Sequence, residues 1–353
     1  MKNFFPLIFA FLFLPAVFSF AQTGGVQDLL KSGIEEHDKG NYEKAIEYYD
    51  KALEYEPDNE VLIYEKAWSY FAMKNYPEVI SLLSGLVEKG QTKIPEVYSL
   101  LASAYDDSGK RDKSVEVFEK GVKRFPKFGL LYCNYGITLM RMDKPGEALD
   151  IFEKGIEKDP DVACNYYYAA KLFSQTEEEI WALIYGEIFI NLEPATARTD
   201  EISKLLYDVY INSIKKDGNS YTISLSKAAD PLNTKQFQAN YEILSLIVIP
   251  GAMEDGITLS SIVEYRNEFL KLWKSRADKI ERSNIVFERQ EQILKADEDF
   301  LECYNYFLLT SGDNDAFNVW FEKNKDDFTK FAKWFNNHPL KFSTLSYYYR
   351  EQY

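Results

Sequence analysis

The first half of the chain repeats one pattern of small residues at a nearly constant interval. Residues in one slot follow each other at steps of 34, 35, 34 and 34 positions. They are Ala45, Val79, Ser114, Ala148 and Ala182. Prolines recur in the same register, with Pro126, Pro160 and Pro194 each 34 positions apart. Self-similarity at this period is characteristic of a solenoid of stacked helix pairs, in which each unit buries its apolar face on its neighbours.

The first unit shows how such a pair is built. Ala45 and Ala52 are seven positions apart, which places them on one face of a helix after two turns. The aromatic residues Tyr42 and Tyr49 lie beside them. Small residues mark a close approach of another helix and large ones fill the adjacent grooves, so we interpret all four as packing residues. Pro57 then ends the helix.

On these residues the chain resembles the tetratricopeptide repeat (TPR) family, whose repeats are helix pairs that cross at small residues. The matching units are 26–59, 60–94, 95–128, 129–162 and 163–196. The second departs most, because Val79 and Leu86 replace small residues and Gly90 ends it without a proline. The resemblance implies an all-α fold, a TPR α-solenoid of about five helix pairs within residues 22–196.

After Pro194 the 34-residue register is lost, and residues 197–353 make up a second, irregular region. Apolar periodicity predicts helices across most of it, interrupted at 217–232 by a loop with at most a short extended piece. The predicted helical stretches are 200–216, 233–249, 259–310 and 341–351. We expect an all-helical C-terminal region and favour a separate cap on the solenoid over an irregular continuation of it.

Specific residues are expected to end these helices. Pro250 should stop the helix of 233–249, and the long stretch of 259–310 should break near Arg282–Asn284. Asp313 or Asp315 should cap one further helix, and Pro339 should limit it.

The N-terminus has the pattern of a signal peptide over residues 1–21. Lys2 precedes an apolar run from Phe4 to Phe20, and small residues suggest cleavage between Ala21 and Gln22. An uncleaved membrane anchor is the alternative, but the run is short, contains two prolines and lacks a basic flank. The sequence therefore predicts an exported protein, most simply a periplasmic one.

Net charge limits the partners to expect, and the cysteines allow a disulfide. The net charge of −15 would repel nucleic-acid phosphates, so we expect no nucleic-acid partner, and the mature chain has no predicted membrane span. Of the three cysteines, Cys133 and Cys164 fall in the first helices of neighbouring repeats. Adjacent first helices run side by side, so the two thiols either form a disulfide or are simply small buried residues.

The sequence offers little for catalysis. It contains only two histidines, His37 and His338, and none of the common metal, phosphate-binding or nucleophile motifs. We therefore predict no catalytic residue, no metal site and no cofactor.

The TPR resemblance implies where a partner would bind, because the first helices of such repeats line a concave groove. The inner-face residues that we select as a partner-binding surface are Tyr64, Trp68, Phe71, Asp106, Asp107, Ile137, Met140 and Tyr167. The first three are apolar aromatics, and exposed patches of this kind usually mark interaction sites. The alternative is that the C-terminal helices of the chain itself fill the groove.

These observations predict a non-enzymatic interaction scaffold or adaptor in the bacterial cell envelope, which binds a peptide or helix of another protein. The alternative function is an extracytoplasmic hydrolase or transferase, with repeats that recruit substrate and an unrecognised site in 197–353.

Overall fold

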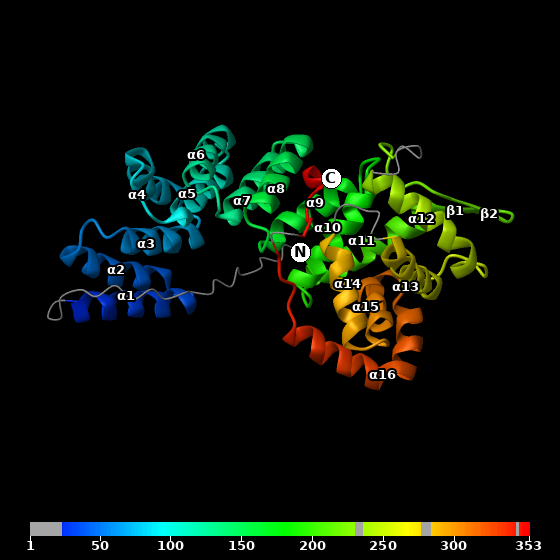
Figure 1. The fold of residues 1–353 in the computed structure, drawn as a ribbon. Helices are drawn as coiled ribbons and strands as arrows, with labels where there is room; N and C mark the ends of the chain where they lie inside the picture. The colour runs from blue at the N-terminus through cyan, green and yellow to red at the C-terminus, as the bar shows by residue number, and fades with distance from the viewer. Residues whose placement is uncertain (1–22, 230–235, 277–283, 344–345) are drawn as a thin grey trace. The chain divides into compact units, whose positions relative to one another are not determined.

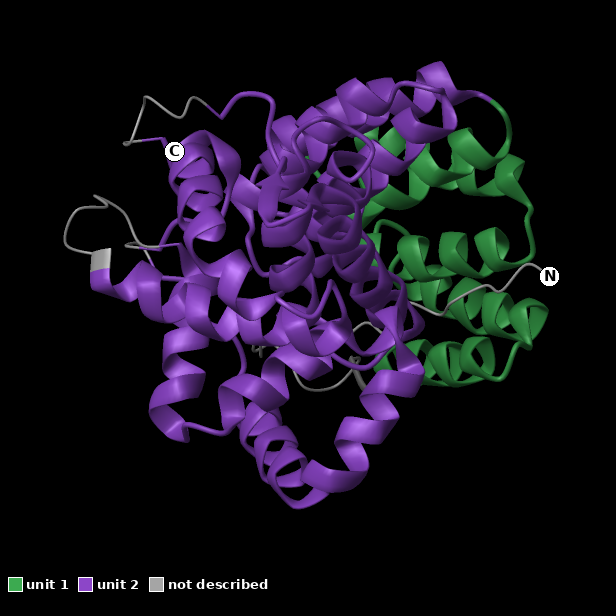
Figure 2. Ribbon diagram, turned by 90° about the vertical axis from the view of Figure 1, so that its right-hand side faces the viewer, with its two compact units in different colours: residues 1–109 green, residues 110–353 purple. Residues whose placement is uncertain are grey.

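The computed structural model describes residues 23–229, 236–276, 284–343 and 346–353 (Figure 1). The predicted cleavage point at Ala21 and Gln22 lies outside these ranges. The chain divides into two compact units, unit 1 up to Gly109 and unit 2 from Lys110 to Tyr353 (Figure 2).

Unit 1 consists of successive helix pairs followed by the first helix of the next pair. Its helices are α1 (Thr23–Asp38), α2 (Tyr42–Tyr55), α3 (Glu60–Ala72), α4 (Tyr76–Lys89) and α5 (Pro95–Asp107). Each helix packs on the next one along the chain. The core between the first three helices contains Ala45, Tyr49, Ala52 and Leu62, all fully buried.

A close helix crossing explains why small and aromatic residues recur together. A Cβ atom added at Gly33 of α1 would lie 2.3 Å from the ring of Tyr49 in α2. The same arrangement recurs in unit 2, where a Cβ at Gly136 would lie 2.3 Å from the ring of Phe152. The small residue lets the aromatic ring of the second helix pack directly on the backbone of the first, as the repeat pattern predicted.

Unit 2 continues the helix pairs before its irregular region begins. The paired helices are α6 (Arg111–Arg124), α7 (Gly129–Arg141), α8 (Pro145–Lys158), α9 (Ala163–Phe173), α10 (Glu179–Leu192) and α11 (Ala197–Ser213). A disulfide joins Cys133 of α7 to Cys164 of α9, whose Cα atoms are 6.0 Å apart. Cys303 is a free, buried thiol, and burial raises its pKa to about 12.

The C-terminal region contains a short hairpin and five further α-helices among the described residues. Its elements are β1 (Ile214–Asp217), β2 (Ser220–Ile223), α12 (Phe237–Ala252), α13 (Leu259–Arg276), α14 (Ile285–Ala296), α15 (Phe300–Leu309), η2 (Thr310–Gly312), α16 (Asn314–Asn337) and η3 (Arg350–Gln352). The two strands pair antiparallel, with Ile214 opposite Ile223. Both residues are buried, which gives the hairpin an inward face.

Two expectations for this region were wrong. Pro250 does not stop a helix but lies inside α12, near its end. A proline has no N–H, so the helix loses its hydrogen bond to the carbonyl four residues earlier. Here that residue is Leu246, which is 41% exposed and so accessible to water. The expected helix at 341–351 is also absent from its described part, in which only Arg350–Gln352 form a helical turn.

Other predicted boundaries fared better. Asp313 caps α16 by accepting a hydrogen bond from the Ala316 backbone N–H at 3.0 Å, and the helix ends before Pro339. Asn284 caps α14, although most of the expected break at Arg282–Asn284 lies outside the described residues. A second interruption, between Ala296 and Phe300, was not predicted.

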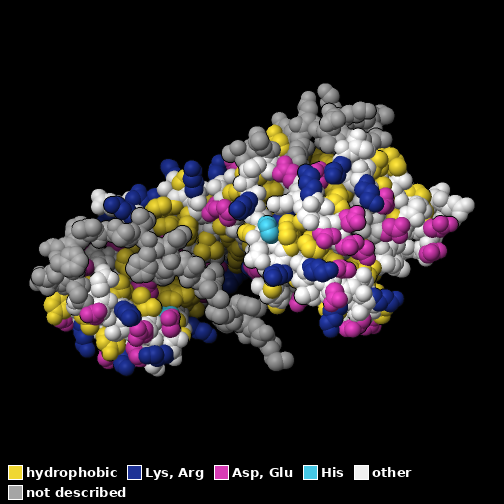
Figure 3. All heavy atoms as spheres, turned by 60° about the horizontal axis from the view of Figure 1, so that its bottom comes forward, with side chains coloured by type: hydrophobic (Ala, Val, Ile, Leu, Met, Phe, Trp, Pro, Cys, Tyr) yellow, Lys and Arg dark blue, Asp and Glu magenta, His cyan; other side chains and the backbone are white. Residues whose placement is uncertain are grey.

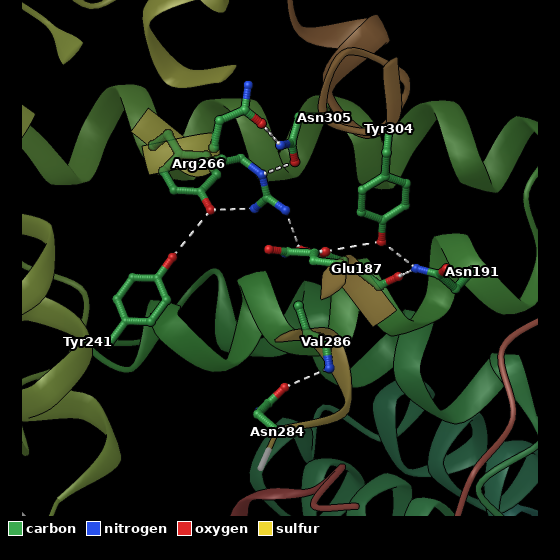
Figure 4. Close-up of polar contacts among 11 residues, drawn as sticks. Glu187, Asn191, Tyr241, Arg266, Asn284, Val286, Tyr304 and Asn305 are labelled. Carbon is green, nitrogen blue, oxygen red and sulfur yellow. Dashed lines mark hydrogen bonds and ion pairs between the residues drawn. The ribbon is translucent and has the colours of Figure 1, made fainter. Parts of the chain in front are cut away.

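A buried polar network attaches the C-terminal helices to α10 (Figure 4). Every residue of α10 from Ile180 to Asn191 is buried. Glu187 of this helix accepts from the Arg266 guanidinium of α13 at 2.7 Å and from the Tyr304 hydroxyl of α15 at 3.0 Å. Repeat and C-terminal helices therefore share one interior.

Further hydrogen bonds to both members of the Arg266–Glu187 ion pair extend the network (Figure 4). Arg266 donates to Tyr210 of α11 and to Asn305 of α15, each at 2.7 Å. Gln290 of α14 donates to the second carboxylate oxygen of Glu187 at 2.7 Å. Each charged group is hydrogen-bonded, which is the condition under which a buried ion pair is tolerated.

Candidate functional site

An aromatic stack lies on the first helices of unit 1. Trp68 and Phe71 are three positions apart on α3, so their side chains share a face. Their rings stack with centroids 5.7 Å apart and planes within 2° of parallel. The His37 ring of α1 also stacks with Trp68, with ring centroids 6.3 Å apart. Trp68 therefore bridges two successive repeats.

A second set of ring contacts repeats with the period of the fold. Tyr42, the first residue of α2, meets His37 edge-on at 5.1 Å, and Tyr76, the first residue of α4, meets Phe71 edge-on at 5.6 Å. Both pairs are separated by five residues, and the second pair lies 34 positions after the first. We call these five residues, His37, Tyr42, Trp68, Phe71 and Tyr76, the aromatic ladder. All five side chains are half-buried.

Hydrogen bonds fix the histidine end of the ladder. The His37 Nδ1 atom lies 2.8 Å from the Ser69 hydroxyl, which is also 3.2 Å from the Glu65 carbonyl oxygen. Burial lowers the pKa of His37, although the nearby Asp38 carboxylate opposes that shift. The ring is therefore neutral near pH 7, and it presents an apolar, stackable face rather than a cation.

The acidic groups behind the ladder are strongly affected by burial. Burial raises the pKa of Glu65 to about 7, and the neighbouring Asp38 carboxylate adds to the shift. Burial also raises the pKa of Tyr64, the third aromatic residue predicted on α3. Tyr64 is half-buried, so only part of its ring is accessible.

The remaining predicted site residues differ in how exposed they are. On α5, Asp106 is 3% exposed, whereas Asp107 is exposed. In unit 2, Ile137 and Met140 of α7 are both half-buried. Tyr167 of α9 is only 6% exposed, and its hydroxyl donates to Glu201 at 2.5 Å, so it offers little surface to a partner.

The structure thus brings Trp68 and Phe71 together with three residues that were not among the predicted site residues. Tyr42 and Tyr76 occupy equivalent slots at the start of second helices, and His37 is equivalent to Phe71. Comparison of aromatic positions across repeats could have found them. On the face shown in Figure 3, hydrophobic side chains lie exposed among acidic and basic ones.

Comparison with known families agrees with the repeat geometry. Family models described as tetratricopeptide repeat match residues 36–104 and 95–128. Residues 36–128 are therefore tetratricopeptide repeats. The predicted fold class, an all-α TPR solenoid followed by further helices, is confirmed by the paired helices and these matches.

Several solved TPR structures are similar to part of the chain. A thermophilic TPR protein from Thermus thermophilus is 16% identical, with a TM-score of 0.42, and the match covers 51% of this chain and 98% of that one. A MamA crystal structure is 20% identical, with a TM-score of 0.39 and coverages of 46% and 94%. YrrB, described as a TPR protein with an unusual peptide-binding site, is 18% identical, with a TM-score of 0.36 and coverages of 50% and 91%.

Among curated proteins, none matches the chain in sequence. Within the described ranges, no helix combines the length and the apolar character that a membrane crossing requires. The same residues contain no cluster of three or more histidine, cysteine, aspartate or glutamate side chains arranged to hold a metal ion.

Proposed function

We propose that this TPR protein is an interaction scaffold that binds an apolar segment of a partner protein on the aromatic ladder. The observation that supports this most directly is the stack of His37, Trp68 and Phe71, whose rings are half-buried and neutral. Large aromatic side chains anchor interfaces because they bury much area at a low entropic cost. TPR proteins typically act as non-enzymatic scaffolds, and the proposed role is of that kind.

Trp68→Ala tests the ladder. If Trp68 anchors the partner, the substitution should weaken binding by about 2 kcal/mol or more, which is roughly thirtyfold in affinity. The measurement is capture of the partner from an envelope extract by the immobilised protein. Tyr55→Ala is the matched control, because Tyr55 is an aromatic residue of the same unit, is 67% exposed and lies outside the ladder.

The same variant separates binding from folding. Because Trp68 stacks on His37 and Phe71, its loss also removes ring contacts inside unit 1. Trp68→Phe keeps a ring at the position and should restore most of the melting temperature while binding remains reduced. A variant Trp68→Ala that melts lower yet captures the partner as well as the parent would rule out the ladder as the binding surface.

We further propose that the protein is exported and works in the bacterial cell envelope. The signal-peptide pattern of residues 1–21 supports this, and so does the Cys133–Cys164 disulfide, since disulfides persist in oxidising compartments. Intact-mass measurement of the purified protein should give a chain that begins at Gln22. A full-length product that requires detergent would contradict cleavage and export in this form.

A further inference from the structure

The last eight residues of the chain lie along α8, α9, α10 and α14 of unit 2, with a strand-like start at Tyr347 and a single helical turn at Arg350–Gln352. We call Ser346–Tyr353 the tail. Tyr347 forms a parallel bridge with Asn284, and its carbonyl oxygen accepts from the Ile285 backbone N–H at 3.0 Å. Ser346 donates to the Glu288 carboxylate at 2.6 Å. The start of the tail is therefore held by strand-like backbone pairing, a mode by which proteins also bind separate peptides.

The centre of the tail is a single arginine held by side chains of repeats four and five. Arg350 makes a bidentate ion pair with Glu153 of α8, with nitrogen–oxygen distances of 3.0 and 2.5 Å. Its guanidinium lies 5.5 Å from the centre of the Phe173 ring. Its backbone N–H donates to the Tyr185 hydroxyl at 2.9 Å. A planar, bidentate pair with an aromatic face beside it selects arginine over lysine.

The acceptor half of this site belongs to the repeats and is organised by them. The Tyr185 hydroxyl donates to Glu153 at 2.8 Å, which fixes the carboxylate without help from the tail. Glu153 and Tyr185 are 4% and 0% exposed, whereas the Arg350 side chain remains 39% exposed. At the end of the tail, the Tyr353 ring packs 4.6 Å from Phe237 and 5.4 Å from Trp181. The surface thus has an arginine pocket, which Arg350 fills, and an aromatic pocket, which Tyr353 fills three positions later.

One tail residue does not suit the surface beside it. Glu351 borders a cavity of about 310 Å³ whose other lining residues are Asp150, Glu153, Lys154 and Glu157. Glu153 pairs with Arg350 and Glu157 pairs with Lys158 at 2.6 Å, and Lys154 is the one basic residue of this lining. Glu351 thus adds a further carboxylate to a lining with more carboxylates than cations, where a basic residue would be better matched. The tail is therefore an imperfect ligand for this surface.

We propose that this surface binds a basic segment of another protein, and that the tail occupies it as an internal competitor. The segment would carry an arginine, a basic residue immediately after it and an aromatic residue three positions after the arginine. This site lies on α8, α9 and α10 in unit 2 and is separate from the aromatic ladder of unit 1. The two proposals can therefore fail independently.

Fluorescence anisotropy with the full-length protein tests the proposal. The probe is a labelled peptide with the tail sequence, Ser-Tyr-Tyr-Tyr-Arg-Glu-Gln-Tyr. In Arg350→Glu the tail carries a carboxylate against Glu153 and should leave the site, so this variant should bind the probe at least tenfold more tightly than the parent. A probe with lysine in place of its glutamate should bind several-fold more tightly still, and one with alanine in place of its arginine should not bind.

Controls make each outcome decisive. The double variant Arg350→Glu/Glu153→Gln should bind the probe at least tenfold more weakly than Arg350→Glu alone. Lys341→Glu, a charge reversal before the tail, should bind the probe as weakly as the parent does. If Arg350→Glu does not fold, Tyr353→Ser frees the aromatic pocket without touching Glu153. A folded Arg350→Glu or Tyr353→Ser protein that binds no probe overturns the proposal. The proposal is also overturned if the parent protein is a dimer and Arg350→Glu makes it a monomer, since the occupant would then be the tail of a second copy.

Discussion

Two glycines of repeat four offer the sharpest test of how the helix pairs are packed. Gly136 of α7 faces the Phe152 ring of α8, and an added Cβ would lie 2.3, 2.5 and 2.8 Å from three of its ring carbons. Phe152 is fully buried and stacks on Tyr168 at 5.1 Å, so the ring has no free space into which to move. Gly146, in the first turn of α8, has no atom within 4 Å of an added Cβ.

The same substitution should therefore have opposite effects at the two positions. Gly136→Ala overpacks the crossing and should lower the free energy of unfolding by about 1–3 kcal/mol. Gly146→Ala adds a better helix former at an open position and should be neutral or raise stability by up to about 1 kcal/mol. For a unit of this size, each kcal/mol corresponds to a shift of about 2–4 °C in melting temperature.

Thermal unfolding followed by far-ultraviolet circular dichroism measures both variants under one set of conditions. Gly33→Ala provides a replicate in unit 1, because a Cβ there would lie 2.3 Å from the Tyr49 ring. If Gly136→Ala and Gly146→Ala melted at the same temperature, the close crossing at Gly136 would be wrong, and with it the register of the repeats.

Three further outcomes are expected. The folded-state pKa of Glu65, about 7, lies above its ordinary value of 4.5, so protonated Glu65 contributes up to about 3 kcal/mol to the free energy of unfolding. This contribution is fully present below about pH 4.5 and is lost as the pH rises to 7. In urea titrations, Glu65→Gln should flatten this dependence on pH. The Cys133–Cys164 disulfide closes a loop with a sequence separation of 31, so reduction should lower stability by about 3–4 kcal/mol in the parent and have no effect on Cys133→Ser/Cys164→Ser. Arg266→Met should cost about 3–5 kcal/mol because it leaves Glu187 buried without its cation, whereas Lys204→Met, which breaks the exposed Lys204–Asp208 pair, should change stability by less than about 1 kcal/mol.

The repeats could be predicted from sequence because each packing rule is applied several times. A single glycine beside a tyrosine, such as Gly33 and Tyr49, carries little information. The recurrence of the same pair as Gly136 and Phe152, with the same spacing of 16 residues, identifies a helix crossing. The ladder was predicted only in part for a related reason. Trp68 and Phe71 were considered within one helix, whereas the contacts Trp68–His37, Phe71–Tyr76 and His37–Tyr42 cross helix boundaries.

The C-terminal region lacks such repetition, and its structure depends on long-range contacts. The sequence predicts a helix over 341–351, a range that includes most of the tail. In the structure Tyr347 pairs with Asn284 and Arg350 with Glu153, 197 positions away. No local pattern encodes such partners, so the absence of a longer helix here follows from tertiary contacts that outweigh helix propensity.

The buried network around Glu187 shows the same dependence and indicates why α10 reads differently from the other second helices. In a solenoid one face of a second helix normally meets solvent, and α8 accordingly alternates buried and exposed residues. α10 is apolar on all sides, which is the pattern of a helix enclosed by others. Glu187 and Asn191 are the polar residues buried within it, and their partners Arg266, Tyr304 and Arg289 all come from the C-terminal region. An apolar repeat helix with isolated buried polar residues therefore indicates where a solenoid is covered, even when the covering segments have no repeat pattern of their own.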